Sequence, residues 1–364
     1  MKKIIIIALL FFIFILPVNA EEYQIDGTDR MESALPDDVN DYFYNNGIDI
    51  ESTDWVKNLN TKNVFSHIWG FLRDGANTPI KAGGGVIAII LITAALKTLS
   101  PEKGAFPAAA YVSILSTVGI IAIPVYSCVS AAVNAIKGCS VFMLSFIPIF
   151  GAIVAISGGT VTSAAMSGLL ITAAEAVSAA ASFIILPFMG AYLAVGICSA
   201  ASPLTSNGAI AESIKKIAIW ILSLITTVFI GILSIQTAVN AAADSLALRT
   251  SKFIVGTAVP IAGGAISEAI STVTASMQLL KSTAGIYAVV ALSLILIPII
   301  CELVIWRLIM AVLVFVSDAT GEEKTSQLIK TIDSMLALLI GITLLVGVMF
   351  IISLTVVINT VKGQ

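Results

Sequence analysis

The sequence predicts an all-α polytopic membrane protein, and three observations lead to this fold class. Hydrophobic residues make up 58% of the 364 residues, charged residues only 11%, and the mean hydropathy is +1.03. Soluble domains are typically about half apolar and a quarter charged. Several apolar runs approach or exceed the roughly 20 residues that a helix needs to cross a bilayer. We expect six to eight transmembrane helices after a cleaved signal peptide, with an amphipathic or re-entrant segment near residues 251–285.

The first 80 residues divide into a signal peptide and an acidic segment. Residues 1–20 combine a positively charged start, an apolar core and a small-residue cleavage site that ends at Ala20, as secretory signal peptides do. Residues 21–80 hold twelve acidic and four basic side chains. We expect this segment to lie outside the cytoplasm and, at about sixty residues, to be marginal as an independent domain. Its charge argues against nucleic acid as a partner.

Residues 81–364 form the predicted helical membrane domain. The apolar runs lie near residues 82–99, 106–129, 141–156, 184–201, 217–239, 286–316 and 335–358, and the weakly apolar residues 162–182 suit a helix buried among others. Gly83, at the start of a triple glycine in the first run, allows close approach of a neighbouring helix. We expect a loop between the second and third runs, a bend near Pro187 and a polar loop over residues 318–333. Whether residues 286–316 cross once or fold back is open.

The orientation follows from the signal peptide and the positive charges. With residues 21–80 outside, the loop that carries Lys97 and Lys103 lies in the cytoplasm, where Lys and Arg are enriched beside membrane spans. The count of spans then places residues 240–282 outside, or dipping in from that side. A slight positive excess in that region sits poorly with an outside placement.

Residues 251–285 combine an apolar stripe with a polar stripe. From Ile266 onward, apolar residues recur at spacings of four and three, which indicates a helix. The polar stripe includes Gln278 and Lys281, with Glu268 beside it. Three interpretations fit this pattern. The helix lies flat in the membrane interface, or it is half of a re-entrant hairpin that turns at residues 260–264, or it packs its polar stripe on a partner protein.

Three ionisable residues, Glu175, Glu302 and Arg307, interrupt apolar segments. A charge at the centre of a bilayer costs about 2.5–3.5 kcal/mol on insertion scales, so each must face protein, water or a counter-charge. Glu175 fits either a carboxylate that lines a pathway or one held within the bundle or near an interface. Glu302 and Arg307 lie five residues apart, which is a poor spacing for one helix face. We therefore expect them to pair with other segments, or Arg307 to lie at the membrane boundary.

No catalytic motif is present in the sequence. The metalloprotease, nucleophile-elbow and Walker A patterns are all missing, and one histidine with four scattered cysteines makes no common zinc site. We predict a protein that is not an enzyme and has no cofactor or metal, with cysteines that serve as small apolar fillers inside helices. The candidate structural or lining residues are Glu175, Lys252, Pro260, Gly263, Gly264, Glu268, Gln278, Lys281, Glu302 and Arg307.

The order of these elements resembles the stage III sporulation protein AE family of endospore-forming Firmicutes. The resemblance covers essentially the whole chain and rests above all on residues 251–285. The matching positions there are Lys252, Pro260, Gly263-Gly264, Glu268, Leu279-Leu280-Lys281 and Gly285, and Ile185-Leu186-Pro187 is a weaker match. These motifs are not catalytic signatures, and the family has no established catalytic residues to carry over.

The resemblance implies a component of the channel or secretion-like complex that joins the mother cell to the forespore. The chain would lie in the mother-cell membrane and face the forespore. Its partners would be the other stage III A sporulation proteins, including a separate cytosolic ATPase, and stage II sporulation protein Q of the forespore. Membrane lipid would surround the spans, and a homo-oligomer is compatible with this role.

Two other functions fit the sequence. One is an ion-coupled secondary transporter that uses Glu175 or Glu302, and the other is a membrane scaffold without a pore. Transporters usually combine paired broken helices with several clustered ionisable groups. Here such groups are sparse and scattered, so the conduit component is favoured over the transporter.

Overall fold

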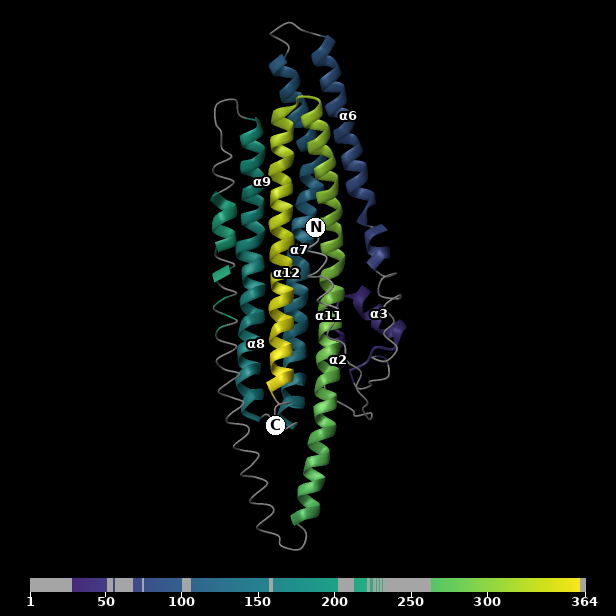
Figure 1. Ribbon diagram of the computed structural model, residues 1–364, viewed down its shortest axis with the longest axis vertical. Helices are drawn as coiled ribbons and strands as arrows, with labels where there is room; N and C mark the ends of the chain where they lie inside the picture. The colour runs from purple at the N-terminus through teal and green to yellow at the C-terminus, as the bar shows by residue number, and fades with distance from the viewer. Residues whose placement is uncertain are drawn as a thin grey trace.

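Long apolar helices packed side by side build the chain in this computed structural model (Figure 1). The structure describes residues 28–50, 55, 68–73, 75–99, 106–156, 160–201, 213–220, 223–224, 227, 229, 231 and 263–360. The main helices are α2 (Thr28–Glu32), α3 (Asp37–Asn46), α6 (Asn77–Leu99), α7 (Phe106–Ile156), α8 (Thr160–Ala180), α9 (Leu186–Ala201), α11 (Gly263–Ala319) and α12 (Glu323–Thr360). These ranges contain no strand, which confirms the all-α class. The predicted signal peptide lies outside them.

Helix α7 joins two crossings that the sequence analysis treated as separate. Residues 106–129 and 141–156 belong to one helix of 51 residues, and the expected loop between them is helical. The prediction of a break is wrong because the connecting residues are rich in alanine, the strongest helix former. Several of them, including Ala132, Val133 and Ile136, are also buried in the bundle.

A second pair of predicted segments also forms one continuous helical segment. Helices α8 and α9 are joined by η1 (Ala181–Ile185), a π-helical turn, so residues 162–182 and 184–201 make a single candidate span. The backbone N–H of Leu186 donates to the carbonyl of Ala181, five residues back. Pro187, which has no N–H to donate, comes directly after this turn. The bend predicted near Pro187 is therefore a π-bulge, a common way for a helix to absorb such an interruption.

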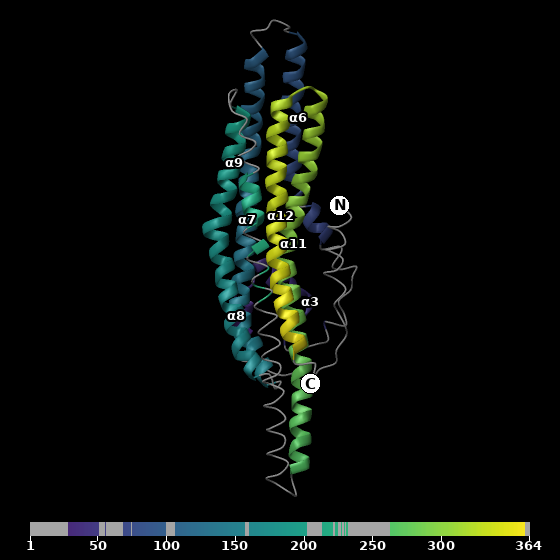
Figure 2. The ribbon, with the colours of Figure 1, turned by 60° about the vertical axis from the view of Figure 1, so that its left-hand side comes forward.

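Helices α11 and α12 form a long hairpin. Helix α11 runs unbroken for 57 residues, so residues 286–316 form one candidate span and Pro298 does not reverse the chain. The polar loop predicted over residues 318–333 is wrong, because a turn of three residues separates the two helices. Gly321 makes this turn with a φ of +71°, a conformation that costs glycine little. The two helices then run side by side (Figure 2).

Five described segments are long and apolar enough to cross a membrane. They are Ile68–Leu99, Tyr111–Ala155, Ser167–Ala200, Thr283–Ala319 and Glu323–Leu354. We expected six to eight. Part of the difference arises because two pairs of predicted spans, one in α7 and one in α8 to α9, each form a single span. The run predicted at residues 217–239 lies largely outside the described residues. Because two pairs of crossings merge, the alternation of sides predicted for the remaining spans is unchanged.

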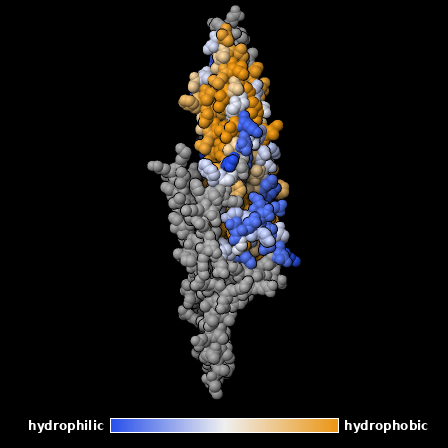
Figure 3. Space-filling view, turned by 90° about the vertical axis from the view of Figure 1, so that its right-hand side faces the viewer, coloured by the Kyte–Doolittle hydropathy of each residue, from blue (hydrophilic) through white to orange (hydrophobic). Residues whose placement is uncertain are grey.

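The acidic N-terminal segment packs on the bundle. Its apolar side chains Met31, Leu35, Val39 and Phe43 are buried and share one core with the long helices. Burial also raises the pKa of the Tyr42 phenol. Figure 3 shows hydrophilic side chains gathered below an apolar surface on this side of the molecule. The segment thus has a water-facing surface and an apolar face that needs the bundle.

Glycines set how closely α6 approaches its neighbours. A Cβ placed on Gly83 would lie 2.5 Å from Cγ2 of Ile309 on α11, and one on Gly85 would lie 3.2 Å from Cδ1 of Ile120 on α7. Gly84 has no neighbour within 4 Å of that position. Two of the three glycines therefore allow the close helix approach that the sequence predicts, one toward each neighbouring helix.

We expect Gly83→Ala to destabilise the bundle, because the new methyl group would overlap the β-branched side chain of Ile309. Overpacking of this kind costs about 1–3 kcal/mol. The apparent melting midpoint of the purified chain in detergent should fall for this variant. Gly84→Ala is the matched control, since its methyl group meets open space. Equal midpoints for the two variants would contradict the packing described for α6.

Candidate functional site

An aromatic contact fixes the N-terminal segment on the long helices. The ring of Phe43 on α3 meets the ring of Tyr287 on α11 edge to face, with centroids 4.8 Å apart. Tyr287 also faces Phe142 on α7 at 6.5 Å. Phe142 in turn begins a stack along one face of α7, with Phe146 at 5.6 Å and Phe150 at 5.2 Å from Phe146. Such pairs add about 0.5–1.5 kcal/mol beyond their burial.

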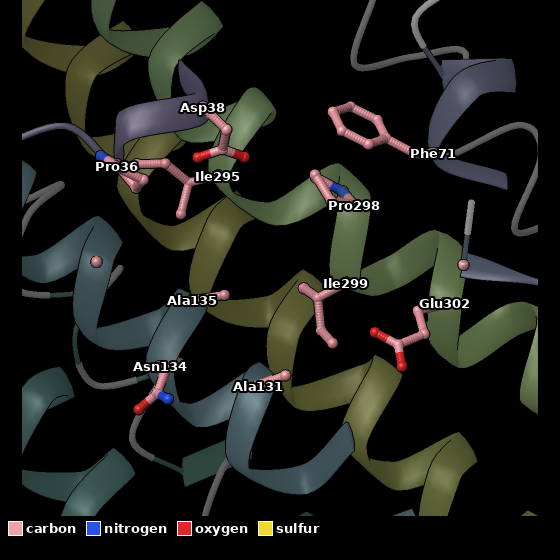
Figure 4. Close-up of a pocket in the computed structure, with 12 residues that line it drawn as sticks. Pro36, Asp38, Phe71, Ala131, Asn134, Ala135, Ile295, Pro298, Ile299 and Glu302 are labelled. Atoms are coloured by element: carbon pink, nitrogen blue, oxygen red, sulfur yellow. The ribbon is translucent and has the colours of Figure 1, made fainter. Parts of the chain in front are cut away.

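This docking leaves a cavity of about 440 Å³ where the N-terminal segment meets α7 and α11. Figure 4 shows the side chains that α11 and α7 contribute, with Asp38 and Phe71 lying across from them. The lining residues are Pro36, Asp38, Phe71, Gly75, Ala131, Asn134, Ala135, Gly138, Ile295, Pro298, Ile299 and Glu302. The α11 residues follow the spacing of one helix face, so α11 supplies a continuous wall.

Glu302 is the charged group that the apolar helices bring to this cavity. It is half-buried, and the thiol of Cys128 on α7 donates to its Oε1 at 3.2 Å. No ion pair joins Glu302 to another described residue. Cys128 is buried, as expected for a filler inside a helix, but its contact with Glu302 gives it a polar role that the sequence analysis missed.

Pro298 leaves one backbone carbonyl of α11 without its usual helical donor. Proline has no N–H, so the carbonyl of Leu294, four residues earlier, receives no hydrogen bond from that position of the helix. Pro298 itself lines the cavity one turn before Glu302. The cavity therefore joins a carboxylate and a weakened stretch of helix, within a run apolar enough to span a membrane.

Arg307 does not share this site. Its guanidinium makes a two-pronged pair with Asp333 on α12, with Nε 2.8 Å from Oδ1 and Nη2 3.1 Å from Oδ2. The spacing of five residues thus separates Glu302 from Arg307, and the arginine pairs with another helix, as predicted. Two parallel hydrogen bonds fix the rotation of α11 against α12 more tightly than a single contact would.

Further polar contacts hold the helices together at the α11–α12 turn. Lys97 at the end of α6 donates to the carbonyl of Gly321 at 3.0 Å and lies 3.6 Å from the buried carboxylate of Glu322. The hydroxyl of Thr325, three residues after Glu322, lies 3.3 Å from that of Ser113 on α7, and both residues are fully buried. This layer joins α6, α7 and α12 at one end of the bundle.

The other predicted site residues do not converge on the cavity. Glu175 on α8 is exposed, and among the described residues it has no hydrogen bond or ion pair. A carboxylate held within the bundle is therefore not what the structure shows. Lys252 and Pro260 lie outside the described residues, and Gly263 and Gly264 begin α11. Glu268, Gln278 and Lys281 are on α11, where only the helical backbone is described.

The helical path of α11 bears on the three interpretations of residues 251–285. Residues 263–285 continue directly into the apolar run as part of the same helix. This first part of α11 reaches past the C-terminal end of α12 (Figures 1 and 2). A helix lying flat in the interface beside an upright span would need a bend between the two parts. The continuous helix has no such bend, so the flat orientation does not fit.

Asp38, Asn134 and Phe71 are site residues that sequence reasoning missed. Asp38 lies in the acidic segment among many similar carboxylates, and Asn134 lies where a loop was expected. Both contribute to the cavity only because the N-terminal segment folds back onto α7 and α11. The signal that was available is the amphipathic pattern of α3, which predicts that this segment needs a partner surface.

Comparison with known proteins gives one family. The family described as stage III sporulation protein AE matches residues 51–361. A curated relative, stage III sporulation protein AE of Bacillus subtilis (strain 168), is 28% identical over 235 residues, which is 64% of this chain and 58% of that protein. The match thus spans less than two thirds of the relative's length. No solved structure matches the chain.

We expect Arg307→Gln to destabilise the bundle, because it leaves the carboxylate of Asp333 without its partner between two helices. With side chains 36% and 29% exposed, the cost should be about 1–2 kcal/mol, below that of a fully buried pair. Lys330→Gln is the matched control, since Lys330 and Asp318 are 55% and 51% exposed. Thermal unfolding in detergent compares the two. A larger fall in midpoint for Lys330→Gln would overturn this ranking of the pairs.

Proposed function

The chain belongs to the stage III sporulation protein AE family, and on this premise we propose that it is a non-enzymatic membrane component of the channel or secretion-like complex between mother cell and forespore. The family match carries the proposal, because it covers residues 51–361 and hence every long helix of the bundle. A role in sporulation therefore belongs to the membrane domain as a whole. The proposed place of the chain is the mother-cell membrane, with its N-terminal segment outside the cytoplasm.

The shape of α11 supports a role in an assembly. Its candidate span begins at Thr283, and the preceding residues 263–282 extend the same helix by about 30 Å at 1.5 Å per residue. The sequence of this extension has one apolar and one polar stripe. An apolar stripe outside a bilayer is stable only against another protein surface. We propose that the extension contacts other members of the complex.

The proposed partners are the other stage III A sporulation proteins, including a separate cytosolic ATPase, and stage II sporulation protein Q. The Walker A pattern is missing from this chain, so ATP-driven work in such a complex would fall to the ATPase. The turn between α11 and α12, where Lys97 meets Glu322, lies on the cytoplasmic side in the proposed orientation. The extension of α11 then lies on the opposite side.

A second function, ion-coupled transport, is favoured by one observation. Glu302 lies in a cavity one turn after Pro298 within an apolar run, and an ionisable group inside such a run is typical of ion-coupled transporters. Glu175, the other carboxylate considered for this role, is exposed on α8 and lies apart from the cavity. A transporter would therefore depend on Glu302 alone.

We expect Gln278→Pro to reduce spore formation strongly in a strain that lacks the native gene. Proline within α11 removes a backbone hydrogen bond and bends the extension, which should separate it from its partners. Isolation of the tagged chain from sporulating cells should then recover less of the other stage III A proteins. Gln278→Ala is the control that keeps the helix. Normal co-isolation with Gln278→Pro at equal chain levels would contradict the proposed contact.

Substitution of Glu302 and Glu175 distinguishes a conduit component from an ion-coupled transporter. We expect both Glu302→Gln and Glu175→Gln to restore spore formation, because a conduit component works by contact and lining and needs no titrating carboxylate. Spore counts in the complemented null strain measure this, with membrane levels of each variant as control. Loss of spores with Glu302→Gln alone, at a normal membrane level, would favour ion-coupled transport.

A further inference from the structure

We propose that the cavity between the N-terminal segment, α7 and α11 binds a primary ammonium group carried on an apolar stem. The ligand would place its ammonium group beside Glu302 and its stem along the apolar walls. This inference goes beyond the proposed function, and it stands whether the chain acts as a conduit component or as a transporter. It rests on the charge, the acceptors and the shape of one cavity.

The charge balance of the cavity favours a cation. Glu302 and Asp38 line it, and no Lys, Arg or His is among the lining residues. The guanidinium of Arg307, five residues along α11, is held by Asp333. An ionised carboxylate in apolar surroundings needs a counter-charge or enough hydrogen bonds. Among the described residues, Glu302 accepts one hydrogen bond, from the thiol of Cys128, and a thiol is a weak donor.

The acceptors suit an ammonium group better than a bare metal ion. An ammonium group has three donors. The cavity offers the carboxylates of Glu302 and Asp38, and Asn134 is a further polar residue of its lining. A calcium ion takes six to eight oxygen ligands, and no group of three or more metal-ligating side chains occurs among the described residues.

The shape and the walls indicate the rest of the ligand. A cavity of about 440 Å³ is far larger than the roughly 30 Å³ that one water occupies in the liquid. Ile295, Ile299 and Ala135 make its walls largely apolar, and Phe71 lies at one side (Figure 4). A ligand that fills such a space needs an apolar stem of several carbon atoms beside its charge. A free alkylamine and a lysine side chain of a peptide share this chemistry.

The experiment uses the purified full-length chain in detergent and measures its apparent melting midpoint during titration. The probes are n-butylammonium chloride and, as the neutral analogue, n-butanol. We expect the ammonium probe to raise the midpoint by about 2–4 °C near saturation and the alcohol to have no saturable effect. A short peptide with a central lysine, compared with its norleucine analogue, tests the second source. Stabilisation by the peptide would identify a lysine side chain as the ligand group.

Variants assign the binding to this cavity. Glu302→Gln keeps an oxygen that can accept a hydrogen bond from Cys128 but removes the charge. This variant should bind the ammonium probe about thirtyfold or more weakly than the native chain does. Glu175→Gln, which removes a carboxylate outside the cavity, should bind the ammonium probe as the native chain does. Equal affinity of the native chain and Glu302→Gln, an equal effect of butanol, or no saturable shift with any probe would overturn the proposal.

A space-filling variant keeps the test decisive if Glu302→Gln does not fold. The Cβ of Gly138→Ala would lie 3.6 Å from Cγ2 of Ile295, an ordinary contact that narrows the cavity without strain. This variant should lower the affinity for the ammonium probe, while the melting midpoint without ligand stays unchanged. Unchanged affinity in this variant would place the probe outside the cavity and would likewise overturn the proposal.

Discussion

The pairing of backbone hydrogen bonds in apolar surroundings is the constraint on which this structure depends. A peptide group that is buried without a partner costs several kcal/mol, and lipid supplies none. The chain therefore continues its helices wherever it can, through the middle of α7 and through Pro298 in α11. Where it cannot keep the α-helical pattern, before Pro187, it uses a π-helical turn. The lengths of the helices are the direct result.

The same constraint makes polar features in the bundle informative. Arg307 and Asp333 satisfy each other between two helices, and Lys97 and Glu322 do so at the hairpin turn. Glu302 differs, because its described partner is a thiol and it faces a cavity. Because Glu302 lies beside an open volume, another group can complete its pairing there.

The sequence was sufficient to predict which parts of the chain are helical and apolar, but not how they join. Composition led to the all-α class, the triple glycine to the close packing of α6, and the five-residue spacing to an interhelical partner for Arg307. The loops expected in α7 and over residues 318–333 were wrong, because local polarity at Lys137 or Lys330 does not show whether a helix continues. Whether it does depends on the partners that its polar residues find in the folded bundle.

The cavity could not be predicted for a related reason. Its polar residues come from positions as distant as Asp38 and Glu302, and they meet only because Phe43 docks on Tyr287. The amphipathic pattern of α3 predicts that a partner face exists but does not identify it. Since that docking also supplies one wall of the cavity, the N-terminal segment and the α11 carboxylate form a single unit. A ligand bound there would hold the segment to the bundle, and loss of the segment would remove one wall of the cavity. The N-terminal segment and the long helices are therefore coupled through this one site.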